Sequence, residues 1–129
     1  MSENKLKKWQ KKSARYAKGE IDAQSFVNAM KNITLYYSTP VGDDKEGNQH
    51  LYVLASKETE YHYFPAFLSL PHCLEFFNAM GRNAFMIIQG TLKDALSSLD
   101  SSPLLAEFGL VIDPSYPNET GIPPSVRVR

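Results

Sequence analysis

Hydrophobic residues recur at helical spacing at the start of this chain, at strand spacing in its middle, and in alternation of the two toward its end. Helical and strand patterns differ because their side chains repeat about every 3.6 and 2 residues, respectively. The expected helices cover residues 4–18, 22–30, 71–80 and 91–99, with a helical turn at 104–108, and the expected strands cover 33–39, 50–55, 61–67, 84–89 and 110–113. This order predicts an α+β fold in which a mixed β-sheet of about five strands packs with helices.

Short local signals predict where several of these elements begin and end. Gly19 is expected to end the first helix, because glycine readily adopts the left-handed conformation needed there. Asp22 is a typical N-cap for the second helix, and Thr91 with Asp94 resembles a capping box. Pro65 lies inside an expected strand, which predicts a sheet edge or a bulge at that position.

Two apolar patterns predict buried faces. In the helix that opens at Pro71, Leu74, Phe77 and Met80 share one side and are expected to face the core. The run over 84–89 is nearly all apolar, as expected of a central strand that is covered on both faces.

The 129 residues suffice for a single domain with a sizeable core. It divides into a basic helical arm (1–19), an α+β core (20–113) and a proline-rich tail (114–129), whose four prolines before residue 125 predict an extended or irregular path. No apolar run is long enough to span a bilayer, and the start lacks the apolar segment of a signal peptide. Cys73 is the only cysteine, which suits a reducing compartment. We therefore expect a cytoplasmic protein.

Charge is distributed unequally along the chain. Residues 1–19 hold seven bases and one acid, a balance of +6, whereas residues 20–126 hold five bases and thirteen acids, a balance of −8. Such a basic arm on an acidic body influences association and partner choice more than the fold. Leu6, Trp9 and Tyr16 share one side of the basic helix and are expected to dock on the domain.

Five pieces of the chain occur in an order that matches a known pattern. They are Gly19-Glu20-Ile21 leading to Phe26, the strand 35–38, the polar loop before 51–55, the stretch 63–69 (YFPAFLS) and the stretch 108–114 (FGLVIDP). Over roughly residues 20–124 the chain thereby resembles the N-terminal domain of the SseB family, with Asp113 where the family's GLxxNP pattern has Asn and Leu68 where its other pattern has Thr. The resemblance implies an α+β fold without known catalytic residues. SseB-like domains also occur beside bacterial toxin genes, which suggests a toxin-neutralising role by analogy of fold.

The residues that could carry chemistry do not combine into a catalytic or metal site. His72 and Cys73 are neighbours on an expected helix and point about 100° apart, so they cannot form a nucleophile–base pair, and Cys73 is expected to be a buried small apolar residue. Glu58, Glu60 and His62 share one strand face, but the presence of only one nitrogen ligand argues against a metal site there. The loop over 42–49 lacks the spacing of a calcium loop and is expected to connect a hairpin. We expect no catalytic residue, metal or cofactor.

These features favour a non-enzymatic protein-binding domain, in particular an immunity protein that binds and neutralises a basic, nuclease-like toxin domain. Nucleases hold phosphates with Lys and Arg, so an acidic inhibitor surface speeds their encounter. The expected partner-binding residues are Asp43, Asp44, Glu46, Glu58, Glu60, Tyr61 and Tyr63. The alternative is an adaptor that binds nucleic acid or an anionic surface through the basic helix. Nucleic acid is the less favoured ligand, because no aromatic stacking platform accompanies that helix.

Overall fold

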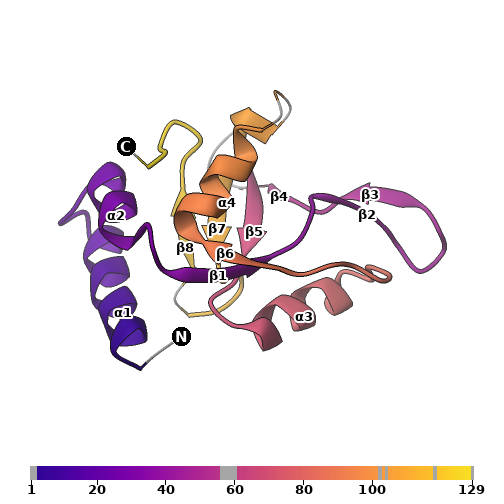
Figure 1. Ribbon diagram of the computed structural model, residues 1–129, viewed down its shortest axis with the longest axis horizontal. Coiled ribbons are helices and arrows are strands. Elements are labelled where there is room, and N and C mark those ends of the chain that lie inside the picture. The colour runs from indigo at the N-terminus through magenta and orange to yellow at the C-terminus, as the bar shows by residue number, and fades with distance from the viewer. Residues whose placement is uncertain (1–2, 56–60, 102, 104, 118, 129) are drawn as a thin grey trace.

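A four-stranded sheet lies at the centre of the molecule (Figure 1). The computed structural model describes residues 3–55, 61–101, 103, 105–117 and 119–128. The order of the strands in the sheet is β4 (Leu54–Ala55), β5 (His62–Ala66), β7 (Gly109–Ile112) and β8 (Thr120–Ile122). β5 and β7 run parallel, while β4 and β8 pair antiparallel with their neighbours. This mixed sheet and its surrounding helices confirm the α+β class.

Four further strands form two antiparallel pairs outside that sheet. β1 (Thr34–Tyr37) pairs with β6 (Ile88–Thr91), and β2 (Val41–Asp43) pairs with β3 (Gln49–Leu51) to form a hairpin. The expected hairpin connection is therefore confirmed. The strands are divided among one sheet of four and two pairs, in place of a single sheet of about five.

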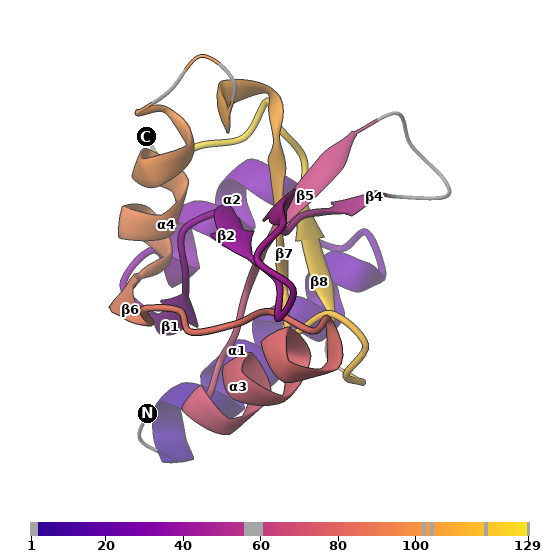
Figure 2. The same cartoon turned by 90° about the vertical axis from the view of Figure 1, so that its right-hand side faces the viewer.

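The helices lie around the central sheet. α1 (Glu3–Ala17) and α2 (Ala23–Met30) pack at one end of the molecule, and the β2–β3 hairpin extends from the opposite end (Figure 1). α4 (Leu92–Leu99) and α3 (Leu70–Ala79) lie between these ends on different sides of the sheet, as Figure 2 shows, and the turn η1 (Leu105–Glu107) precedes β7. None of the helices in the described part of the chain is long and apolar enough to cross a membrane.

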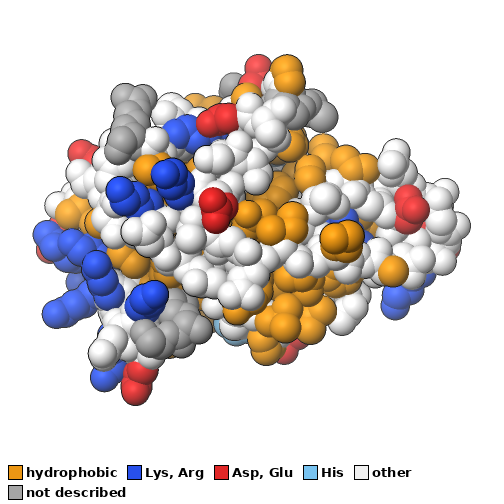
Figure 3. Space-filling view, viewed as in Figure 1, with side chains coloured by type: hydrophobic (Ala, Val, Ile, Leu, Met, Phe, Trp, Pro, Cys, Tyr) orange, Lys and Arg blue, Asp and Glu red, His pale blue; other side chains and the backbone are white. Residues whose placement is uncertain are grey.

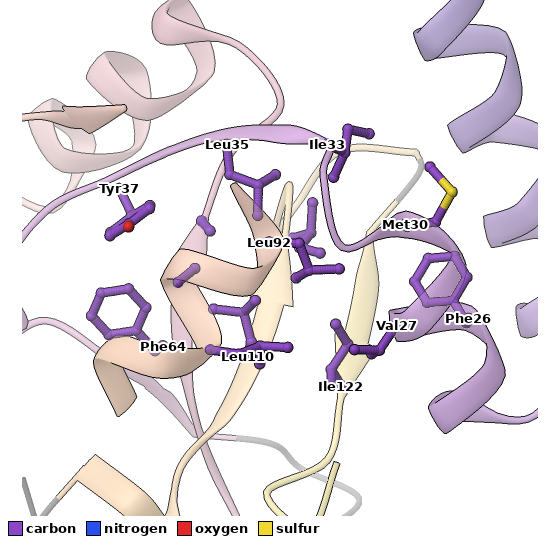
Figure 4. Close-up of a cluster of buried hydrophobic side chains, with 14 of the residues drawn as sticks. Phe26, Val27, Met30, Ile33, Leu35, Tyr37, Phe64, Leu92, Leu110 and Ile122 are labelled. Carbon is purple, nitrogen blue, oxygen red and sulfur yellow. The ribbon is translucent and has the colours of Figure 1, made fainter. Parts of the chain in front are cut away.

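The main core gathers apolar side chains from helices and strands that are far apart in the sequence. In Figure 4, Val27 of α2 points toward Ile122 of β8, and Leu92 of α4 lies beside Leu110 of β7. Its fully buried members include Trp9, Phe26, Val27, Leu35, Leu92, Leu96, Leu99, Leu110, Ile112 and Ile122. A second, smaller cluster joins Tyr52, Phe67, Cys73 and Phe77.

The basic helix α1 is docked on this core. Trp9 is fully buried, and its ring lies 5.2 Å from that of Phe26 in an edge-to-face contact. Tyr16 stacks on Phe26 at 4.9 Å between ring centroids and donates a hydrogen bond of 2.9 Å to the carbonyl of Gly121. The expected docking is confirmed for Trp9 and Tyr16, whereas Leu6 keeps 37% of its surface exposed.

The predicted helix ends are confirmed. Gly19 follows α1 with φ of 75°, and the Asp22 carboxylate accepts the Ser25 N–H at 2.7 Å. Thr91 and Asp94 form the expected capping box at the start of α4. Pro65 needs no bulge, because β4 pairs only with the first two residues of β5 and leaves the proline at an edge on that side.

The expectation of a covered central strand over 84–89 is wrong. The strand begins only at Ile88, and its one partner among the described strands is β1. Met86, just before it, has 80% of its surface exposed. A short apolar run indicates an extended segment but not what covers it. In this chain, both strands of the β1–β6 pair lie outside the central sheet, so part of the run stays at the surface.

Two other expectations on burial and strand content need correction. α3 buries Cys73 and Phe77, whereas Leu74 and Met80 are exposed, because two apolar stripes at helical spacing compete for the inner face. The tail after residue 113 is not wholly irregular, since Thr120–Ile122 forms β8 against β7. A three-residue strand between prolines is too short to show a period in the sequence.

Candidate functional site

Three of the expected acidic site residues lie on the β2–β3 hairpin, where Asp44 has a structural role. Its Oδ1 accepts the N–H groups of Glu46 and Asn48, both at 2.9 Å, and its Oδ2 lies 2.7 Å from His50 Nε2. These hydrogen bonds, the one from the Asn48 backbone foremost, lower the pKa of Asp44. Asp43 and Glu46 are exposed beside it. Asp44 therefore shapes the turn, and its two neighbours remain accessible to a partner.

The other expected site residues lie elsewhere. Tyr61 is exposed just before β5, and the half-buried ring of Tyr63 covers Gly109, where an added Cβ would lie 2.7 Å from Tyr63 Cε1. Glu58 and Glu60 fall outside the described residues. The hairpin and β5 point in different directions in Figures 1 and 2. The described members of the set are therefore split between two places, and Tyr63 is a packing residue.

The hairpin carries an exposed apolar surface that the sequence interpretation missed. Val41 and Leu51 are directly opposite each other across the hairpin and keep 41% and 43% of their surfaces exposed. Met86, on the segment leading into β6, is the most exposed large apolar residue among those described. We name Val41, Leu51 and Met86 the hairpin face.

The segment that carries Met86 follows the hairpin closely. The Ser38 hydroxyl donates to the Met86 carbonyl, and the Asn83 N–H donates to the Asp43 carbonyl at 2.9 Å. Asp44 and Arg82 form an isolated antiparallel bridge. The chain from 82 to 91 thus runs beside the chain from 34 to 44, which joins β6, β1 and the hairpin into one long ribbon. The three residues of the hairpin face therefore lie on adjoining segments of this ribbon.

Apolar and basic side chains are separated on the surface. In Figure 3, orange side chains spread from the region of α3 to the base of the hairpin, whereas blue side chains gather at the opposite end, over α1 and α2. At that basic end, a cavity of about 140 Å³ is lined by Lys5, Lys8, Ala29, Met30, Asn32 and Ile33. The basic residues near the start of the sequence are therefore also grouped at one end of the molecule, whereas acidic side chains are spread over the face shown in Figure 3.

Arg82 is a buried cation beneath the hairpin, with 3% of its surface exposed. Gly81, with φ of 72°, ends α3 and lets the Arg82 N–H bond to the Phe77 carbonyl. The guanidinium then lies between aromatic rings, 4.7 Å from the centroid of Tyr52 and 4.9 Å from that of Phe77. Burial lowers the pKa of Arg82. In the sequence, this buried cation was indicated only by a single Arg that follows a helix-ending Gly and lies between aromatic stretches.

The nitrogen atoms of Arg82 are only partly satisfied. Nη2 donates to the Thr39 hydroxyl and to the Val41 carbonyl, both at 3.2 Å. Nε and Nη1 have no hydrogen-bond partner among the described residues, and neither has the buried Tyr52 hydroxyl. Buried polar groups are normally paired, so this cluster is unusual.

His72 and Cys73 have separate surroundings: Cys73 lies in the smaller apolar cluster, and His72 lies beside Asp113 and Tyr116. Burial raises the pKa of the Cys73 thiol to about 11, which disfavours the nucleophilic thiolate. His72 stacks on Tyr116 at 3.7 Å, and its Nδ1 lies 3.3 Å from Oδ2 of the buried Asp113. The other oxygen of Asp113 accepts the Leu68 N–H at 2.9 Å. Within the described residues, no group of three or more His, Cys, Asp or Glu side chains could hold a metal ion.

Comparison with known proteins adds no relative. No protein-family model matches the chain, and no curated protein or solved structure matches it. The resemblance to the SseB family stays a prediction that rests on the short stretches quoted above.

Proposed function

We propose that this chain is a non-enzymatic protein-binding domain and that it binds its partner through the hairpin face. The single observation behind the proposal is the exposure of Val41, Leu51 and Met86, which keep 41%, 43% and 80% of their surfaces exposed on adjoining segments. Single exposed apolar residues are common on monomers, whereas grouped ones mark interaction sites. Methionine suits such a surface because its flexible side chain adapts to a partner.

The charges beside the hairpin face support a cationic partner. Asp43 and Glu46 are exposed on the hairpin, and their carboxylates would form a polar rim around an apolar centre, as in many protein interfaces. A basic toxin domain of the nuclease type fits this rim, and the chain would then act in the cytoplasm as its neutralising immunity protein. The identification of the partner as a toxin is more specific than the proposal of a binding surface. It is supported by the acidic rim and by the SseB resemblance.

The test begins with affinity purification of the tagged chain from its source cells, followed by production of the co-purifying protein. Binding of the two purified proteins is then measured by calorimetry. Leu51→Asp and Met86→Asp should each weaken binding about tenfold or more, because a charge would be buried at the centre of the interface. Leu6→Asp is the matched control: Leu6 is 37% exposed on α1, at the other end of the molecule, and its variant should bind normally.

The polar rim of Asp43 and Glu46 is tested separately, by the rate of association and its dependence on salt. Asp43→Asn with Glu46→Gln should slow association and reduce its dependence on salt, while dissociation changes little. An acidic co-purifying protein would contradict the proposed toxin partner. Full-strength binding by both aspartate variants of the hairpin face would contradict the proposed surface.

An adaptor that binds an anionic surface through α1 is the second candidate. The grouping of Lys and Arg at that end of the molecule favours it (Figure 3). Deleting α1 is a poor test, because Trp9 belongs to the core. Replacing the exposed Lys7, Lys8 and Lys11 by glutamine leaves the core intact. Loss of binding to phosphatidylglycerol vesicles or RNA in this variant would support the adaptor function, and absence of binding by the unmodified chain would reject it.

A further inference from the structure

The charge of Arg82 is not neutralised by the part of the chain that the structure describes. Its guanidinium is 3% exposed, and none of the ion pairs found there within 4.0 Å includes it. The nearby Asp44 directs its carboxylate at its own turn and at His50. The guanidinium of arginine stays protonated when it is buried, and burial of an unpaired charge is unfavourable. A buried guanidinium therefore normally has an anionic partner.

Three polar groups in the Arg82 cluster lack a hydrogen-bond partner among the described residues. Nε and Nη1 lack acceptors, and the Tyr52 hydroxyl, whose ring is stacked against the guanidinium, also lacks a partner. The Thr39 hydroxyl accepts from Nη2 at 3.2 Å and adds a further polar group. One cation, neutral hydroxyls and aromatic walls suit an anion with a single charge and an apolar body.

The hairpin covers these groups without a core of its own. No side chain of β2 or β3 is buried. Gly42 lies directly on the guanidinium, since a Cβ added there would be 2.5 Å from both Nε and Nη2. Two-stranded hairpins are marginally stable by themselves. Opening of the hairpin would break its hydrogen bonds to Arg82 Nη2 and to the Asn83 N–H, but it would take no side chain of β2 or β3 out of the core.

We propose that Arg82, with the hydroxyls of Tyr52 and Thr39, binds a carboxylate group, and that the β2–β3 hairpin opens to admit it. The carboxylate belongs either to a free organic acid with an apolar body or to a glutamate or aspartate side chain of a bound polypeptide. A phosphate dianion fits less well, because a single guanidinium supplies the only positive charge of the site. The proposal is independent of the hairpin face as a docking surface.

The test uses the full chain and two probes, sodium benzoate and a capped pentapeptide with one central glutamate. Binding is followed by the NMR resonances of the Arg82 Nε–H and the Gly42 N–H and by the melting temperature. Benzoate should shift both resonances saturably, with a dissociation constant on the order of 1 mM, and should raise the melting temperature as its concentration increases. The same shifts with the glutamate peptide, but not with its glutamine counterpart, would identify a polypeptide as a source of the carboxylate.

Variants separate binding from folding. Tyr52→Phe keeps the ring and removes the hydroxyl, so it should weaken benzoate binding about threefold to tenfold. Tyr61→Phe, at an exposed tyrosine just before β5, should bind benzoate as the unmodified chain does. In Arg82→Lys, which lacks the Arg82 Nε–H, benzoate should no longer shift the Gly42 N–H resonance. Unmoved resonances with both probes at about a hundred times the expected dissociation constant, or tighter binding of inorganic phosphate than of benzoate, would overturn the proposal.

Discussion

Replacing Trp9 by alanine tests whether α1 belongs to the core of the domain. The side chain is fully buried against Phe26, and truncations of buried Trp or Phe to Ala cost about 3–5 kcal/mol of unfolding free energy. The indole Nε1 has no hydrogen-bond partner among the described residues, so the unmodified protein already bears a cost of about 1–3 kcal/mol that the variant removes. We therefore expect a net loss of about 2 kcal/mol, a large part of the stability of a typical domain.

Urea unfolding measured by far-UV circular dichroism gives that free energy. Trp9 is the only tryptophan, so its fluorescence in the unmodified protein reports on the docking of α1 directly. Both signals should change at the same urea concentration. Trp9→Phe should cost only about 1 kcal/mol, because it keeps an aromatic ring and removes the unpaired N–H, and Leu6→Ala on the exposed side should cost about 0.5 kcal/mol. A Trp9→Ala loss below that of Leu6→Ala, with fluorescence changing before circular dichroism, would refute the docking of α1.

Three further predictions concern single side chains. Gly42→Ala should cost about 1–3 kcal/mol in urea unfolding, since its methyl group would meet the Arg82 guanidinium, whereas Gly121→Ala, whose methyl would be 3.8 Å from its nearest neighbour, should fold with little strain. Because the pKa of Asp44 is lowered, its ionised form stabilises the fold at pH values above the ordinary pKa of 3.8. This contribution disappears as the pH falls through the folded-state pKa. Asp44→Asn should therefore be less stable at pH 7 and should lose less stability on acidification. Cys73 should react with iodoacetamide at pH 8 only as fast as the domain unfolds, because the thiol is buried and its pKa is about 11; rapid labelling of the folded protein would contradict its burial.

Local chemistry made part of the fold predictable. Gly19, Asp22 and the Thr91–Asp94 pair act through neighbouring residues, and all of them have the predicted role. The docked side of α1 was also predictable, because Trp9 and Tyr16 are the two aromatic residues of that helix and lie on one side of it.

Long-range pairing was not readable from the same patterns. Burial of the apolar segment over 84–89 depends on which strand pairs with it and on which elements pack above it. The amino acids of the segment itself determine neither. The inner face of α3 was ambiguous because Cys73 with Phe77 and Leu74 with Met80 both satisfy helical spacing. The Arg82 cluster joins side chains from residues 39, 52, 77 and 82, which come together only after the hairpin and α3 have packed.

The parallel pairing of β5 with β7 has a consequence for how the chain folds. Ala66 ends β5 and Gly109 begins β7, so α3, β6 and α4 must all be traversed before the two strands can meet. Trp9 near the start and Ile122 and Val126 near the end share the same core cluster. Contacts between such distant positions slow folding, because a long loop must close before any interaction compensates its entropy. During synthesis on the ribosome, the native core therefore cannot be completed until residue 126 has emerged, and the exposed intermediate that precedes it is the form most open to capture by a chaperone.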